Sequence, residues 1–221
     1  MTHDEVSLAQ TTSARVRELL ASGQFVPGEK LVEEHVACRL GISRNTLREA
    51  FRLLGAQGLI TYVPNRGVFV AAPDEAAVID IFRARYAIQG RAITIAMKSH
   101  PAVAEMHSRA AEGRRACEVE DWRSVAAHNL EFHRSMVRLC DSPRLTDCFD
   151  VILAELGLVF NLLEQNRHLH EPYVHLNLQI VDCLEIGDND AALERLNAYL
   201  VTSERAIIAA LQRVKSRRIS A

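Results

Sequence analysis

The 221-residue chain carries 26 Lys and Arg against 28 Asp and Glu, and 48% of its residues are hydrophobic. This composition suits one large or two small folded domains and excludes the disordered and fibrous classes. The formal net charge of -2 neither indicates nor excludes nucleic-acid binding, so the distribution of charge decides. Since the longest apolar stretch is interrupted and no basic-then-apolar leader follows Met1, we expect a cytoplasmic protein without a membrane span.

Glycine, proline and strand-forming residues concentrate before about residue 73, whereas the later sequence is rich in Ala, Leu, Arg and Glu with helical periodicity. We therefore predict two domains, residues 1–72 and residues 73–221. The cysteines are widely spaced and never form a Cys-x-x-Cys pair, which argues against a disulfide framework and a thiolate zinc site. We expect them to be reduced and mostly buried: Cys38, Cys117, Cys140, Cys148 and Cys183.

The first domain has helix-turn-helix spacing. Apolar periodicity predicts helices over residues 8–22 and 31–40, and a third begins after Ser43 and runs to about residue 57. Gly41 ends the second helix, so only a three-residue turn separates it from the third. Strands over residues 59–63 and 67–70, joined by a polar tip, predict a wing.

Positive charge is concentrated in this part of the chain. Between Ile42 and Gly67 the charged residues are four arginines against Glu49 alone. The first turns of the third helix, the part of a recognition helix that enters the major groove, carry Ser43, Arg44, Asn45, Thr46 and Arg48. Arginine pairs with guanine and asparagine with adenine, so this surface predicts a DNA interface. The alternative is an ordinary solvated face on a winged helix that docks proteins.

Three stretches carry a family resemblance: PGEKL at 27–31, LGISRNTLREA at 40–50 and NRGVFV at 65–70. Residues 8–71 closely resemble the winged-helix domain of GntR-family bacterial transcription regulators. The resemblance implies that Arg44, Asn45, Thr46 and Arg48 read or position DNA, and that Ser43 contacts the backbone. It also implies that Arg66 and Gly67 lie at the minor-groove side of the wing.

The second domain reads as an all-α antiparallel bundle because its turns are short and it shows no strand signal. The predicted helices span residues 74–99, 101–117, 121–140, 143–164, 172–186 and 190–215. Polar residues interrupt their apolar faces on four helices: Arg85, Asn129, His133, Asn177 and Tyr199. Isolated buried polar groups are costly unless they satisfy one another or a guest, so we expect them to converge on one pocket.

Each of these residues also has a structural interpretation. Arg85 can form an interior ion pair with a glutamate such as Glu155, and a lone histidine such as His133 is often a hydrogen-bonded core residue.

Residues 78–200 resemble FCD, the effector domain of the FadR branch of the GntR family, through FRARYAI at 82–88, NLEFH at 129–133 and IVDCLEIGD at 180–188. Many members hold a divalent metal with one Asp and three His, and the metal helps to hold a carboxylate effector. Those ligand positions fall here on Asn129, His133, Asn177 and Tyr199. Since only the histidine is kept, we expect no zinc or nickel; if a metal binds, His133 with His175 would hold it.

By the same resemblance, Arg85 stands at a position where the family has an arginine near the pocket, and Gln89 stands where family members commonly have a glutamate. Without a metal, Arg85 becomes the expected anchor of a small anionic effector, such as an organic acid, alongside the other pocket residues.

We therefore predict a homodimeric, ligand-responsive regulator that binds a pseudo-palindromic operator on double-stranded DNA. The resemblance implies a repressor released by its effector as the commoner case, with an activator as the alternative. The sequence shows no phosphate loop, nucleophile elbow or metalloprotease signature, so we do not expect an enzyme. The alternatives are a protein-docking adaptor and a metal-dependent sensor of the same family.

Overall fold

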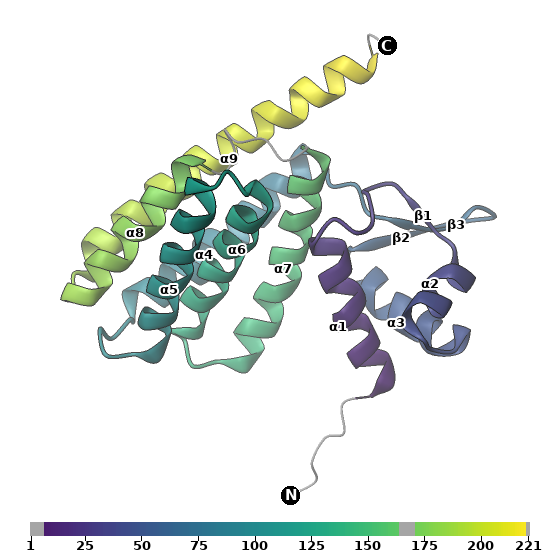
Figure 1. Cartoon of the computed structure of the whole chain (residues 1–221), viewed down its shortest axis with the longest axis horizontal. Helices are drawn as coiled ribbons and strands as arrows, with labels where there is room; N and C mark the ends of the chain where they lie inside the picture. Colours follow the sequence, from purple (N-terminus) through teal and green to yellow (C-terminus); the bar gives the residue numbers. More distant parts are fainter. Residues whose placement is uncertain (1–6, 164–170, 220–221) are drawn as a thin grey trace, which may run out of the picture. The chain divides into compact units, whose positions relative to one another are not determined.

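A sheet and three helices form the amino-terminal part of the computed structural model, which describes residues 7–163 and 171–219, with side chains described as far as residue 216 (Figure 1). The elements are α1 (Leu8–Ala21), β1 (Lys30–Leu31), α2 (Glu33–Leu40), α3 (Arg44–Ala56), β2 (Ile60–Val63) and β3 (Gly67–Val70). The antiparallel sheet has the order β1-β3-β2. The chain separates into two compact units, and this first unit extends to Pro73 and also includes Ala154–Leu162.

Local signals in the sequence set the helix ends of this unit. Ser7 caps α1 in a reciprocal capping box with Gln10, and Gly41 ends α2 in the left-handed conformation at φ 69°. The amphipathic faces of α1 and α3 meet in one core, to which the end of α7 (Pro143–Leu162) adds two side chains. This core includes Val16, Leu20, Leu47, Phe51, Leu54, Ala154 and Leu158.

The expected start of the second helix is wrong by two residues. Lys30 and Leu31 form strand β1, paired with Phe69 and Val68, and α2 begins only at Glu33. A two-residue strand leaves no periodic pattern in the sequence, because its partner lies far along the chain.

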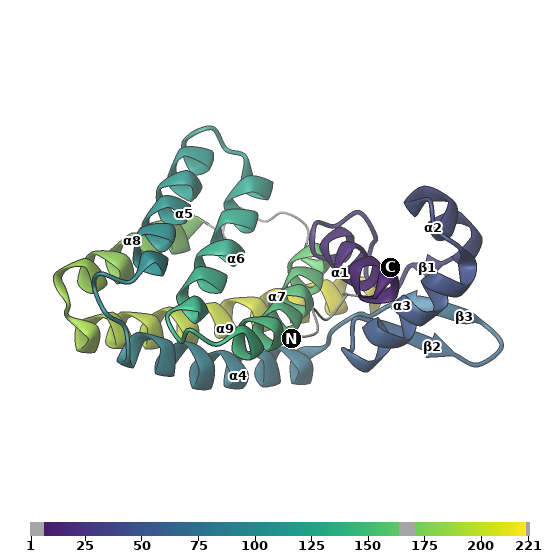
Figure 2. The ribbon, with the colours of Figure 1, turned by 90° about the horizontal axis from the view of Figure 1, so that it is seen from below.

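The second unit is a helical bundle in which α5 packs on α6 and α8, α4 packs on α6 and α9, and α8 packs on α9 (Figures 1 and 2). Its helices are α4 (Glu75–Thr94), α5 (Pro101–Glu118), α6 (Trp122–Arg138), α8 (Glu171–Ile186) and α9 (Asn189–Ile219), together with the start of α7 (Pro143–Leu162). The predicted fold class, a winged helix-turn-helix followed by an all-α bundle, is confirmed.

The long helix α4 ends at Thr94, five residues before the expected end at Ser99. The Asn189 side-chain amide donates to the carbonyl oxygen of Ala96 at 2.8 Å. A residue far along the chain thus provides a hydrogen-bond donor for a backbone carbonyl just beyond the helix end. The expected end of the helix that starts at Pro143, near residue 164, lies outside the described residues.

All five cysteines are free thiols, but the expectation that most are buried is wrong. Cys183 is buried, Cys38 and Cys148 are exposed, and the other two are half-buried. Among the helices that the structure describes, none is long and apolar enough to cross a membrane.

Candidate functional site

The amino-terminal end of α3 is a preorganised, solvent-facing surface. Ser43 caps the helix, since its Oγ accepts from the Thr46 backbone N–H at 3.1 Å and lies 2.8 Å from the Thr46 hydroxyl. Arg44, Asn45 and Arg48 are exposed, while the opposite face of α3 lies in the core. The helix thus presents its polar first turns outward on a rigid support.

Two of these arginines are engaged in ion pairs with the first turn of α2. Arg44 Nη2 lies 2.6 Å from Glu34 Oε1, and Arg48 Nε lies 2.8 Å from Glu33 Oε2. The basic excess counted between Ile42 and Gly67 is therefore partly compensated in the fold. Counting charges in that sequence window missed this because both glutamates precede it.

The wing carries the other predicted contacts. Arg66 is exposed, and its guanidinium lies 5.6 Å from the centre of the Phe69 ring. Gly67 has φ 107°, and a Cβ there would approach Lys30 Cε to 3.3 Å. The positive φ favours glycine at this position, whereas the nearest neighbour is the end of a flexible lysine side chain that can move aside.

An open groove of about 500 Å³ runs along the same surface. Its lining joins the start of α1 to the exposed face of α3: Leu8, Ala9, Asn45, Thr46, Arg48, Glu49 and Arg52. The predicted contacts of α3 thus border a concave, mainly polar surface.

The six residues predicted for the second domain come together inside its bundle. They are buried on three helices and on the start of the long last helix: Arg85, Gln89, Asn129, His133, Asn177 and Tyr199. Their hydrogen bonds form two short chains that meet near Arg85.

The first chain fixes the protonation of His133. Arg85 Nε donates to Gln89 Oε1 at 3.2 Å, which turns the Gln89 amide nitrogen toward His133 Nδ1 at 2.7 Å. Arginine only donates, so Nδ1 accepts and the proton of the neutral ring lies on Nε2. Burial first, and the Arg85 charge second, hold the pKa of His133 well below 6.5, in agreement with a neutral imidazole.

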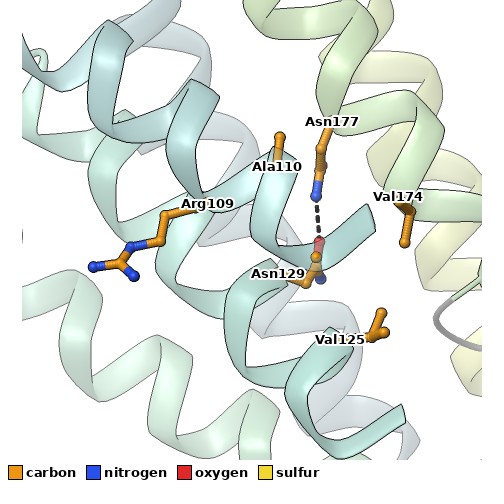
Figure 3. A pocket seen from close by; sticks show the side chains of 7 residues that line it. Arg109, Ala110, Val125, Asn129, Val174 and Asn177 are labelled. Carbon is orange, nitrogen blue, oxygen red and sulfur yellow. Dashed lines mark hydrogen bonds between the residues drawn. The ribbon is translucent and has the colours of Figure 1, made fainter. Parts of the chain in front are cut away.

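The second chain centres on Asn129 Oδ1. This oxygen accepts from Asn177 Nδ2 at 2.7 Å and from the Tyr199 hydroxyl at 3.1 Å, and Figure 3 shows the two asparagines pointing at each other across the gap between α6 and α8. Burial raises the pKa of Tyr199 to about 12, so its hydroxyl is neutral.

Arg85 is a buried cation that forms no ion pair with any carboxylate of the described residues. Only 1% of its surface is exposed, and the rings of Phe82 and Tyr199 lie 4.8 Å and 5.9 Å from its guanidinium carbon. Burial lowers the pKa of Arg85, yet a guanidinium remains charged. No carboxylate among the described residues forms an ion pair with it, so the alternative pairing with Glu155 is not observed.

Three polar atoms of this cluster lack a hydrogen-bond partner within the described protein: Arg85 Nη2, His133 Nε2 and Asn177 Oδ1. Two are donors and one is an acceptor, because the neighbouring contacts fix the ring tautomer and the amide orientation. Buried groups of this kind are rarely left unpaired in proteins. The cluster is therefore chemically incomplete and suited to a polar guest.

A cavity of about 10 Å³ lies beside the two asparagines, about the space of one water molecule. Figure 3 shows the lining residues, with the Arg109 side chain directed away from the asparagine pair. The cavity is lined by Arg109, Ala110, Gly113, Val125, Asn129, Val174 and Asn177. In this conformation this cavity has no room for an organic ligand.

Sequence reasoning missed two buried neighbours of the cluster. Tyr173 stacks edge-on with Tyr199 at 4.8 Å between ring centres, and Ser203 is buried as well. The signal was present, since Tyr173 lies one turn before Asn177 and Ser203 one turn after Tyr199, on the same helix faces.

His175 does not reach the cluster. It is exposed on α8, and its Nε2 lies 2.8 Å from Gln179 Nε2 of the same helix. The four family ligand positions offer two neutral amides, a neutral phenol and one imidazole whose Nδ1 is already bonded. This donor set does not fit a tightly held zinc or nickel ion.

The family models match both parts of the chain. The model described as bacterial regulatory proteins, gntR family, covers residues 8–70, and the FCD domain model covers residues 80–202. The chain belongs to the GntR family.

As a GntR regulator with an FCD domain, the protein is a ligand-responsive, DNA-binding transcription regulator and not an enzyme. The resemblance found in its sequence is thereby confirmed.

Individual relatives agree with this assignment. The chain is 27% identical to a "Probable D-xylose utilization operon transcriptional repressor" of Paenarthrobacter nicotinovorans, over 86% of each protein. It is 25% identical to the "Nta operon transcriptional regulator" of Aminobacter aminovorans, over 74% of this chain and 79% of the relative. A crystal structure of a GntR transcriptional regulator from Rhodococcus sp. RHA1 superposes with a TM-score of 0.84 at 28% identity, covering 91% of this chain and 98% of the other.

Proposed function

We propose that this GntR regulator is a homodimeric cytoplasmic repressor, released from a pseudo-palindromic operator when a small organic anion enters the Arg85 cluster. The observation that carries the effector class is the buried Arg85 guanidinium, which has no carboxylate partner in the part of the chain that the structure describes. A buried cation is costly, and an anion that accepts from Arg85 Nη2 and His133 Nε2 would remove that cost. Asn177 Oδ1 remains to accept from a donor group of the same effector.

The proposed site works without a divalent metal. The donor set of Asn129, His133, Asn177 and Tyr199 is neutral, and a cation would be repelled by Arg85 nearby. The charge that a metal supplies in other family members is here supplied by arginine, which also offers directed hydrogen bonds.

On the DNA side, the proposed contacts are the exposed first turns of α3 and the tip of the wing: Ser43, Arg44, Asn45, Thr46, Arg48, Arg66 and Gly67. One such domain makes too few contacts for tight specific binding, which is why we propose a dimer that reads two half-sites.

The DNA contacts are tested by Arg48→Ala on a duplex that the wild-type protein enriches from a random pool. We expect the affinity to fall by about tenfold or more, as for a lost arginine contact to a base or phosphate. Unchanged affinity would remove Arg48 from the interface.

The effector class is tested by titrating mono-, di- and tricarboxylates in a calorimeter, with D-xylose as a neutral comparator because one relative is named for D-xylose utilization. We expect at least one carboxylate to bind the wild type, to lose affinity by about a hundredfold in Arg85→Met, and to weaken binding to the enriched duplex. Arg83→Met, an exposed change on the same helix, is the matched control. Tight binding of the sugar with no response to any anion would overturn the proposal.

A further inference from the structure

The first turn of α2 places two carboxylates beside the surface proposed to read DNA. Glu33 and Glu34 are the first two residues of this helix, and its N-cap, Val32, forms no side-chain capping bond. A helix start of this kind, with free N–H groups and a positive dipole end, commonly receives a DNA phosphate. In α2, the carboxylates of Glu33 and Glu34 provide negative charge at this helix start.

The two glutamates hold the two arginines differently. Glu34 binds a terminal nitrogen of Arg44, so the pair competes directly with any phosphate or base that this guanidinium would contact. Glu33 binds Nε of Arg48, the nitrogen nearest the chain, which leaves both terminal nitrogens free for a guanine edge. The Glu34 contact thus occupies the Arg44 guanidinium, whereas the Glu33 contact holds the Arg48 side chain in one orientation.

These contacts are weak as stabilising elements. The side chains of Arg44 and Glu34 are 57% and 69% exposed, and ion pairs in such surroundings add little to folding stability. Their effect on a second anion is larger, because a phosphate approaching either arginine meets a carboxylate held next to it.

We infer that Glu33 and Glu34 are specificity-determining residues that suppress binding to non-operator DNA. Non-specific affinity comes almost entirely from phosphate neutralisation, and here a carboxylate beside each arginine offsets part of its positive charge at the protein surface. At the operator, hydrogen bonds from the arginines to base edges offset the free energy that is lost when the ion pairs are disturbed. Phosphate contacts alone, as on non-operator DNA, do not offset this loss. The inference rests on the proposed DNA-reading role of Arg44 and Arg48.

The test compares Glu33→Gln and Glu34→Gln with wild type on two probes: the duplex enriched by the wild-type protein, and a shuffled duplex of the same composition. Glutamine removes the charge and keeps an oxygen that can accept from arginine. Glu105→Gln is the matched control, because Glu105 forms a solvent-exposed pair with Arg138 at 2.6 Å in the helical bundle.

We expect each α2 variant to bind the shuffled duplex about threefold to tenfold more tightly, with a salt dependence steeper by about one phosphate contact. Affinity for the enriched duplex should change less, so the ratio of specific to non-specific affinity should fall by about threefold or more. Circular dichroism and thermal melts report whether the fold is retained in each variant.

A specificity ratio and a salt slope that match those of Glu105→Gln in both variants would overturn the inference. The outcome is separable from the proposed interface itself. If Arg48→Ala weakens binding to the enriched duplex while both glutamine variants behave as the control, only the role of the glutamates fails.

Discussion

At the scale of single residues, we expect Arg85 to lower the stability of the ligand-free protein while it serves the proposed binding of the effector. A buried charge that lacks its counter-ion lowers the free energy of unfolding, and replacing such groups by apolar side chains is commonly neutral or stabilising. The neighbouring rings of Phe82 and Tyr199 offer an apolar surface that a methionine can contact.

We expect Arg85→Met to raise the free energy of unfolding in the absence of effector by about 1 kcal/mol or more. Chemical denaturation followed by circular dichroism measures this, with the exposed Arg83→Met as control. A clear loss of stability would show that Arg85 has a structural role in the ligand-free protein.

His133 makes stability depend on pH. The pKa of this ring lies well below 6.5 in the folded protein, whereas the unfolded chain takes up the proton at its ordinary pKa. Below pH 6.5 the unfolded state therefore binds more protons, and the free energy of unfolding falls by up to about 1.4 kcal/mol per pH unit until the folded pKa is reached.

His133→Asn should flatten this slope, since an amide oxygen in place of Nδ1 still accepts from Gln89 and does not titrate. Denaturation curves between about pH 7 and pH 5 provide the comparison, with the exposed His35→Asn as control for loss of an imidazole. Equal slopes in wild type and His133→Asn would contradict the assignment of this pH dependence to His133.

At the scale of elements, two helical glycines have opposite surroundings. A Cβ added at Gly90 of α4 would lie 3.7 Å from the Leu193 side chain, an ordinary contact. A Cβ at Gly157 of α7 would lie 3.1 Å from Ala21 Cα and 3.2 Å from its carbonyl oxygen, both of them backbone atoms of α1 that cannot turn aside.

We therefore expect Gly90→Ala to stabilise the protein by about 0.5–1 kcal/mol, the usual gain in a helix interior. Gly157→Ala should lose this gain and destabilise the first unit, because α1 has to shift. Unfolding curves of both variants decide the point, and equal stabilisation by both would refute close packing of α7 on α1.

Local patterns were sufficient for most of the helices and for the convergence of the cluster. Ser43 and Gly41 mark helix ends by their own chemistry, and the spacing of Asn129 and His133 places both on one helix face. Features set by distant partners escaped prediction: strand β1 depends on residues 68 and 69, and the chain after α4 depends on Asn189.

The charge of the surface proposed to contact DNA was misjudged for a related reason. Arg44 and Arg48 meet carboxylates ten or more positions earlier in the chain, a pairing that no sequence window around α3 contains. The hydrogen-bond direction at His133 also needed coordinates, because it follows from which end of the Gln89 amide faces Arg85.

At the scale of the whole molecule, assembly and metal content can be read in one measurement. A native mass spectrum of the purified protein should show a dimer, either at the polypeptide mass or with a small organic adduct. A monomer would contradict the proposed pairing of half-sites, and about one divalent metal per chain would contradict the metal-free site.

The water-sized cavity beside Asn129 and Asn177 has a kinetic consequence. An organic anion is too large for this cavity, so binding beside the two asparagines requires the helices to separate locally, and the apparent affinity is then reduced by the fraction of molecules that are open. The observed association rate should then level off at high ligand concentration, at the rate of opening rather than of diffusion.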